Sequence, residues 1–192
     1  MPVNITRIFD FPYYQLETYD LSKTFTTKYN GEWQSISTQE YINQANAISR
    51  GLLRLGIRPN DKIAVISSTN RTEWNIVDIG ILQIGAQNVP IYPTIAKEDY
   101  EYILNHSEAT ICFVSDAEVL EKLNAIKTNT KLKGVFTFND ISGEKNWKEV
   151  LKLGEDNSNQ SDVDSLNENV TPNDLATLIY TSGTTGKPKG VM

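Results

Sequence analysis

The order in which apolar runs and helical stretches alternate along the chain limits its fold most strongly. Four short runs are rich in apolar residues, and they lie at 62–66, 88–91, 110–114 and 135–138. Stretches of helical character lie between these runs, at 72–84, 97–105 and 117–127. The runs are apolar at consecutive positions, which is typical of parallel strands covered on both faces. The alternation therefore predicts an α/β fold with a mostly parallel sheet flanked by helices, in a doubly wound arrangement.

The segment before the first apolar run carries two local signals. Residues 1–36 are predicted to be irregular and rich in aromatic side chains, apart from a hairpin in which Asn30 and Gly31 join TFTTKY to EWQSI. Ser37 and Glu40 then form the ends of a capping box that begins a helix. Apolar residues recur on one face of this helix, and Gly56 is the predicted stop.

The second half of the chain is predicted to contain a polar connection and a final strand. Residues 154–170 hold five acidic side chains and no Lys or Arg, so this stretch accounts for most of the net charge of −6. We interpret 154–170 as an acidic exposed loop that follows an α/β core at 37–153. A strand at 176–180 and a loop rich in Gly, Ser and Thr make up the last part, 171–192. Lys and Arg are not concentrated anywhere in the sequence, so we expect no nucleic-acid partner.

The single Cys and the single His of the sequence are both interpreted as structural residues. Cys112 lies in the apolar run TICFV and is predicted to be a small buried hydrophobic residue in a reduced, cytoplasmic protein. His106 follows a helix end, where an exposed imidazole near the terminal carbonyl groups is expected. No stretch approaches the roughly 20 apolar residues of a membrane-spanning helix. The N-terminus also lacks the basic and apolar regions of a secretory signal.

The segment YTSGTTGKPKG, at 180–190, contains the groups that hold a polyphosphate. Gly183 and Gly186 permit positive φ angles and leave backbone N–H groups uncovered, and successive N–H groups of this kind form a nest for oxyanions. Lys187 and Lys189 supply positive charge. Hydroxyl groups add donors that can also ligate Mg²⁺. These hydroxyl groups belong to Thr181, Ser182, Thr184 and Thr185.

Two other interpretations of this segment were weighed. Clusters of Gly, Ser and Thr usually mark a flexible surface turn, and composition alone leaves that alternative open. A P-loop requires Gly where this chain has Thr181, and Ser or Thr where it has Pro188. Both anchor positions fail, so the segment is not a P-loop.

The order of residues in YTSGTTGKPKG resembles the phosphate-binding signature of the AMP-forming acyl-activating (adenylate-forming) superfamily. Upstream, GLLRLGIRPNDKIAVIS is similar to the early segment of that family, with Asn60 where the family commonly has Gly. The stretch NRTEWNIVDIGILQIGAQNVPIYPTI, particularly VPIYPT, is similar to the long-chain fatty acyl-CoA synthetase branch. The resemblance runs from about residue 25 to the end of the chain.

The resemblance implies that the chain is the first part of the large N-terminal domain of an adenylate-forming enzyme. Such an enzyme uses ATP, Mg²⁺ and coenzyme A to convert a carboxylic acid into an acyl adenylate and then a thioester. By family position, Thr181 would supply a hydroxyl near Mg²⁺ and Lys189 a cation for ATP, whereas Lys187 would be a solvated charge. The residues expected to cradle phosphate oxygens are Ser182, Gly183, Thr184, Thr185 and Gly186. The catalytic residues are expected downstream of Met192, so residues 1–192 alone should be inactive.

Several alternatives remain open at the level of sequence. The acid is expected to be a long-chain fatty acid, but an aryl, short-chain or amino acid is the main rival within the superfamily. A non-catalytic α/β module that grips phosphate, or a scaffold with a degenerate loop, are alternatives of another class. An open strand edge would favour dimers or aggregation, and the lipid substrate would favour peripheral contact with a membrane.

Overall fold

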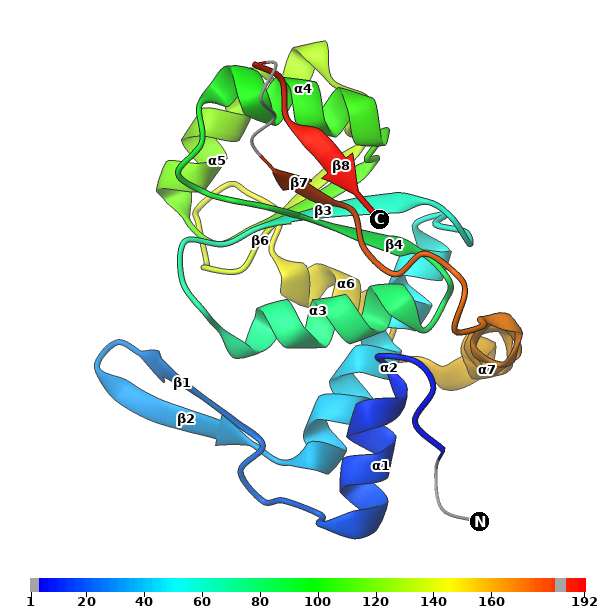
Figure 1. The fold of residues 1–192 in the computed structure, drawn as a ribbon. Coiled ribbons are helices and arrows are strands. Elements are labelled where there is room, and N and C mark those ends of the chain that lie inside the picture. The colour runs from blue at the N-terminus through cyan, green and yellow to red at the C-terminus, as the bar shows by residue number, and fades with distance from the viewer. Residues whose placement is uncertain (1–3, 182–185) are drawn as a thin grey trace. The chain divides into compact units, whose positions relative to one another are not determined.

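The computed structural model describes residues 4–181 and 186–192, and they form two compact units (Figure 1). The first unit comprises Met1–Arg58, Asn70–Gly85 and Val150–Asp174. The second unit comprises Pro59–Thr69, Ala86–Glu149 and Leu175–Met192. Each unit gathers three separate stretches of chain, whereas the divisions expected from the sequence were consecutive ranges.

The second unit is built on a parallel four-stranded sheet with the order β4-β3-β5-β6. Its strands are β3 (Lys62–Ile66), β4 (Gln87–Ile91), β5 (Ile111–Val114) and β6 (Gly134–Thr137). Its helices are α4 (Lys97–Ser107), α5 (Ala117–Asn124) and the short 3₁₀ helix η1 (Lys127–Asn129). The chain starts at β3, adds β4 on one side and then β5 and β6 on the other. The predicted α/β fold and its parallel sheet are therefore confirmed.

Both faces of this sheet are buried, as the consecutive apolar residues predicted. One face, with Ala64 and Ile66 of β3, packs into the cluster formed with α4 and α5, which lie along the sheet in Figure 1. The side chains that alternate with these, Ile63 and Val65, are also fully buried. Phe113 of β5 stacks on Phe136 and on Phe138, at ring-centroid distances of 5.6 and 6.0 Å. Continuous apolar runs were thus the correct signal for this sheet.

The last part of the chain adds to the β4 edge and then forms a second small sheet. The backbone N–H of Asn88 donates to the carbonyl of Ala176 at 3.0 Å, and the N–H of Leu178 donates to the carbonyl of Asn88 at 3.0 Å. Strands β7 (Ile179–Thr181) and β8 (Lys189–Val191) then pair antiparallel. The strand predicted at 176–180 is therefore divided between an edge contact and β7.

The first unit contains the hairpin and the capped helix that the sequence predicted. Strands β1 (Phe25–Tyr29) and β2 (Glu32–Ile36) are joined by Asn30 and Gly31, whose φ angles are 50° and 90°. Positive φ at both positions is what a two-residue turn of this hand requires. In helix α2 (Thr38–Arg54), the hydroxyl of Ser37 accepts from the N–H of Glu40, and the Glu40 carboxylate accepts from the N–H of Ser37.

The prediction that residues 1–36 are irregular outside the hairpin is wrong, because Asp10–Thr18 form helix α1. Its sequence, DFPYYQLET, is poor in strong helix formers, although Pro12 is tolerated in a first turn. Packing on other elements replaces the missing propensity: the hydroxyl of Tyr13 donates to Asn46 of α2 and to Gln83, each at 3.3 Å. Such long-range contacts cannot be detected from local sequence.

The prediction of an acidic loop at 154–170 is correct about exposure and wrong about structure. Most of its side chains are exposed, but the stretch forms a 3₁₀ turn, η2 (Asn157–Asn159), and helix α7 (Gln160–Asn169). Val163 is 1% exposed and holds α7 in the unit. From α2, Arg50 donates to the carbonyl of Gly154 at 2.7 Å, and Arg54 pairs with the Asp156 carboxylate at 3.2 Å. Cations of another helix thus order an acidic segment that lacks cations of its own.

The remaining helices were predicted in part. Helix α3 (Thr72–Leu82) was expected at 72–84 and is as deeply buried as its apolar surface indicated. It packs so closely on α2 that a Cβ added to Gly80 would lie 2.5 Å from a side-chain carbon of Ile48. Helix α6 (Trp147–Leu153) was not predicted, and its residues divide between the two units at Val150.

Candidate phosphate-binding site

The β7–β8 hairpin brings the two ends of the Gly/Ser/Thr-rich loop together in the second unit. Thr181 lies directly opposite Lys189 in the antiparallel register. Directly opposed residues of an antiparallel pair project from the same face, so the Thr181 hydroxyl and the Lys189 ammonium group share one face of the hairpin. Both side chains are exposed. The pairing therefore places one donor and one cation side by side at the mouth of the loop.

Of the other residues predicted to hold phosphate, the structure describes only Gly186. Its φ angle is +90°, which confirms the expectation that this position uses a conformation favoured by glycine. The expected phosphate contacts of Ser182, Gly183, Thr184 and Thr185 lie outside the described residues. Their roles stay predictions, as do the ligand roles of Thr181 and Lys189.

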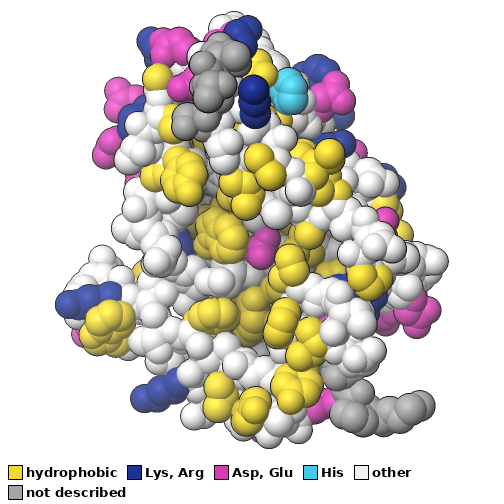
Figure 2. Space-filling model, in the orientation of Figure 1, with side chains coloured by type: hydrophobic (Ala, Val, Ile, Leu, Met, Phe, Trp, Pro, Cys, Tyr) yellow, Lys and Arg dark blue, Asp and Glu magenta, His cyan; other side chains and the backbone are white. Residues whose placement is uncertain are grey.

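Tyr180, the residue before Thr181, is the buried part of the hairpin, with 6% exposure. Its hydroxyl oxygen lies 2.8 Å from Nδ1 of His106 on α4. Burial raises the pKa of Tyr180, with a smaller contribution from Tyr102, so the hydroxyl keeps its proton at neutral pH. His106 is exposed, as predicted, but it lies within the last turn of α4 and not after the helix end, and its contact with Tyr180 was not foreseen. In Figure 2 the only imidazole of the chain, in cyan, lies at the surface with a dark blue cation beside it.

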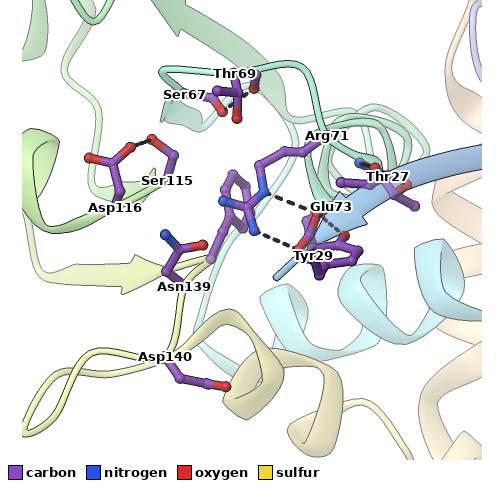
Figure 3. Close-up of polar contacts among 12 residues, drawn as sticks. Thr27, Tyr29, Ser67, Thr69, Arg71, Glu73, Ser115, Asp116, Asn139 and Asp140 are labelled. Carbon is purple, nitrogen blue, oxygen red and sulfur yellow. Dashed lines mark hydrogen bonds and ion pairs between the residues drawn. The ribbon is translucent and has the colours of Figure 1, made fainter. Parts of the chain in front are cut away.

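A polar cluster at the carboxyl ends of β3 and β5 was missed by sequence reasoning. Ser68 follows β3, and Ser115 and Asp116 follow β5. The hydroxyls of both serines donate to Oδ2 of Asp116. The bond from Ser115, at 2.6 Å, is drawn in Figure 3. Burial would raise the pKa of Asp116, but hydrogen bonds from Ser115 and Ser68 outweigh it and leave the pKa below its ordinary value. Asp116 also caps α5 through the N–H of Val119. Polar residues directly after two neighbouring parallel strands were the available signal.

The first unit holds a buried ion pair, also missed from the sequence. Nη2 of Arg71 lies 2.7 Å from Oε1 of Glu73, and the hydroxyl of Tyr29 on β1 donates to Oε2 at 2.7 Å (Figure 3). Beside it, the hydroxyls of Thr27 and Thr72 are 2.7 Å apart. These contacts join the β1–β2 hairpin to the start of α3. None of the buried side-chain N and O atoms in this cluster lacks a hydrogen-bond partner, which is typical of a structural arrangement.

The first unit also contains a cavity of about 490 Å³, lined mainly by aromatic and aliphatic side chains. It lies between α1, the start of β1, α2 and α3. Phe11 and Tyr19 at its rim are more than half exposed, and apolar side chains gather in this part of Figure 2. None of the described lining residues is Lys or Arg. The cavity therefore lacks the charge that a polyphosphate requires, in contrast with the β7–β8 hairpin.

Within 4–181 and 186–192, no three side chains of His, Cys, Asp or Glu come together in a way that could hold a metal ion. In the same residues, no helix has both the length and the apolar character that crossing a bilayer would need.

The sequence profile of the AMP-binding enzyme family matches residues 15–192. A long-chain-fatty-acid–CoA ligase of Xenopus laevis is 33% identical over 172 residues, which is 86% of this chain and 23% of that protein. A long-chain-fatty-acid–CoA ligase of Mycobacterium bovis is 33% identical over 168 residues, which is 84% of this chain and 26% of that protein. This chain thus spans about a quarter of the length of these curated relatives.

A solved structure with the same fold is that of a long-chain-fatty-acid–CoA ligase from Archaeoglobus fulgidus. It superposes with a TM-score of 0.75 and 26% identity, over 100% of this chain and 36% of the other. The match includes the whole of this chain, the β7–β8 hairpin among its elements.

Proposed function

Because this chain belongs to the family of AMP-binding enzymes, we propose that it is part of an ATP-dependent long-chain fatty acid–CoA ligase. Two observations support the fatty acid as substrate. The relatives that are one-third identical to this chain are named as long-chain-fatty-acid–CoA ligases. The solved structure from Archaeoglobus fulgidus, which matches this chain over its whole length, is also named as a long-chain-fatty-acid–CoA ligase.

The proposed reaction has two steps. An oxygen of the fatty acid carboxylate attacks the α-phosphorus of ATP. The bond between the α-phosphorus and the oxygen that bridges it to the β-phosphate breaks, and pyrophosphate leaves. The sulfur of coenzyme A then attacks the carbonyl carbon of the acyl adenylate, its proton is lost, and AMP departs. The first step depends mainly on stabilising negative charge on the leaving pyrophosphate.

The observation that carries the proposal is the pairing of Thr181 with Lys189 at the ends of the loop. In the proposed role, Lys189 offsets charge on the β- and γ-phosphates. Backbone N–H groups and hydroxyls of the loop would hold phosphate oxygens, as the sequence pattern TSGTTG predicts. Protein sites usually hold Mg²⁺ through one or two side chains together with substrate phosphates. The hydroxyl of Thr181 is the ligand that this chain would contribute.

Location and assembly belong to the same proposal. The single Cys112 is fully buried and cannot form an internal disulfide, which is the observation that favours a reduced, cytoplasmic setting. Cell fractionation tests this location, and binding of the full-length enzyme to lipid vesicles tests peripheral membrane contact. Sedimentation of the full-length enzyme tests the proposed homodimer.

The reaction is tested by ATP–pyrophosphate exchange in the full-length enzyme. We expect exchange that depends on a long-chain fatty acid and on Mg²⁺. The double variant Gly183→Ala/Thr184→Val should lower the exchange rate roughly 100-fold or more, because it adds a Cβ where uncovered backbone N–H groups are expected and removes a hydroxyl donor expected to stabilise the leaving group. Thr128→Val, at an exposed threonine of η1, is the matched control and should leave the rate unchanged.

Two results would count against the proposal. Exchange supported by an aryl, short-chain or amino acid and not by a fatty acid would replace the substrate class. An unimpaired loop variant would remove the assigned role of the loop in gripping phosphate.

A further inference from the structure

The Gly/Ser/Thr-rich loop that follows Tyr180 and leads to Lys189 is called the phosphate loop here, after its proposed role. Residues at both of its ends contact the same helix, α4, within the second unit. At the first end, Tyr180 of β7 meets His106, with 2.8 Å between the hydroxyl oxygen and Nδ1 and 5.7 Å between the ring centroids. The rings are edge-on, with an interplanar angle of 89°. Tyr180, which precedes Thr181, is thus held against α4 by a hydrogen bond and a ring contact with His106.

At the second end, the ammonium group of Lys187 lies 5.3 Å from the centroid of the Tyr102 ring. This distance is within the range of a cation–π interaction. The sequence alone suggested that Lys187 is a solvated charge; its side chain is exposed, yet one side of it faces an aromatic ring. Tyr102 thus gives Lys187 a defined position close to Lys189.

The two contacts form one unit on the helix. Tyr102 and His106 are four residues apart, so they lie on the same face of α4. Their rings stack, with centroids 5.4 Å apart and an interplanar angle of 29°. A shift of either ring therefore changes the support of both ends of the loop.

Gly190 provides the space that this arrangement needs. It pairs with Tyr180 across the β7–β8 hairpin, and a Cβ added to it would lie 3.3 Å from Cζ of the Tyr180 ring. The ring lies across β8 and reaches His106 on α4. A side chain at Gly190 would press on the ring and disturb the contact with His106.

We propose that Tyr102 and His106 are positioning residues for the phosphate loop, His106 acting through Tyr180 and Tyr102 acting through Lys187. The inference rests on the proposed function of the loop and goes beyond it, because neither residue is part of the loop. Contacts that already hold Tyr180 and Lys187 reduce the conformational freedom that these two residues lose when a ligand binds. The two contacts therefore favour binding of the triphosphate of ATP.

The test measures ATP–pyrophosphate exchange by variants of the full-length enzyme, with KM determined separately for ATP and for the fatty acid. His106→Ala and Tyr102→Leu should each raise KM for ATP roughly two- to tenfold, the size expected for one hydrogen bond or one cation–π contact. KM for the fatty acid should not change. Lys97→Ala, exposed at the start of α4, controls for changes to the helix.

Conservative variants separate positioning from general stability. His106→Asn keeps a polar group near the position of Nδ1, and Tyr102→Phe keeps the ring face, so both should retain most of the wild-type affinity for ATP. Tyr180→Phe combined with His106→Ala should be no worse than the more severe single variant, because the two residues make one contact. Equal KM values for ATP in Tyr102→Leu, His106→Ala and the wild type would overturn the inference.

The same data distinguish failure of this inference from failure of the proposed function. A wild-type enzyme without acid-dependent exchange would refute the proposed function. Normal wild-type exchange with parallel increases in both KM values of the variants would overturn the inference alone, because general loss of structure does not single out ATP.

Discussion

Glu73 is a carboxylate that the fold keeps charged at 6% exposure. Burial alone would raise its pKa, but the hydrogen bonds from Arg71 and Tyr29 outweigh burial and hold the pKa below the ordinary value of 4.5. Removing one partner of a buried pair leaves the other charge without compensation, which is the costly part of such an arrangement. Loss of either partner of the Arg71–Glu73 pair should therefore destabilise the junction between β1 and α3.

We expect Glu73→Ala to lower the free energy of unfolding by about 3 kcal/mol, measured by chemical denaturation of the full-length enzyme. Tyr29→Phe, which removes only one hydrogen bond to the same carboxylate, should cost about 1 kcal/mol. Equal effects of the two changes would show that the charge of Glu73 is not stabilised by Arg71.

The lowered pKa of Glu73 also has a consequence for acid stability. Its stabilising contribution is fully present above the unfolded-state pKa, near 4.5, and is lost as the pH falls through the lower folded-state pKa. The stability difference between the wild type and Glu73→Gln should therefore shrink in denaturation series run below pH 4.5. A difference that grows in acid would contradict the assigned direction.

Single residues were predictable where their role is local. Asn60, which stands where the family commonly has Gly, adopts a left-handed conformation with φ of 68°, and Cys112 is fully buried as its apolar run indicated. The contact of His106 with Tyr180 joins residues 74 positions apart, and no local pattern encodes it. Residue chemistry at the site was thus readable from sequence, and the partners of those residues were not.

At the scale of elements, the start of α2 is specified by a few side chains. Ser37 and Glu40 satisfy each other's backbone N–H groups, which have no partner within the helix. We expect Ser37→Ala to lower the free energy of unfolding by about 1 kcal/mol, whereas Ser37→Asp should be close to wild type because Asp is an equally good N-cap. Thermal or chemical denaturation of the full-length variants measures both. An Asp variant as unstable as the Ala variant would argue against the cap.

Elements were predicted well where burial of the segment's own apolar residues determines its secondary structure. They were predicted poorly where packing on another element determines it. The strands β3 to β6 lie within a residue of their predicted positions, because an apolar run that is buried on both faces has few alternatives. Helices α1 and α7 were missed because their sequences are aromatic or polar and acidic. The segment before α7 has no basic side chain, and Arg50 and Arg54 of α2 supply the cations that contact it.

At the scale of the whole molecule, this chain corresponds to about a quarter of its curated relatives. It includes the hairpin at the mouth of the phosphate loop. We therefore expect residues 1–192, expressed alone, to show no ATP–pyrophosphate exchange with a fatty acid, while the full-length enzyme is active under the same conditions. Exchange by the isolated chain at a rate near that of the full-length enzyme would show that the reaction needs nothing else.

The register of the β7–β8 hairpin restricts how the loop can vary in length. Thr181 faces Lys189 across the pair, and side chains alternate between the two faces along a strand. One residue inserted into the loop or deleted from it, if it were taken up by a one-residue shift of β8 against β7, would turn the ammonium group to the opposite face. Such a slip would separate the cation from the hydroxyl even if every amino acid type were kept. Natural variants of this loop should therefore tolerate substitutions better than insertions or deletions.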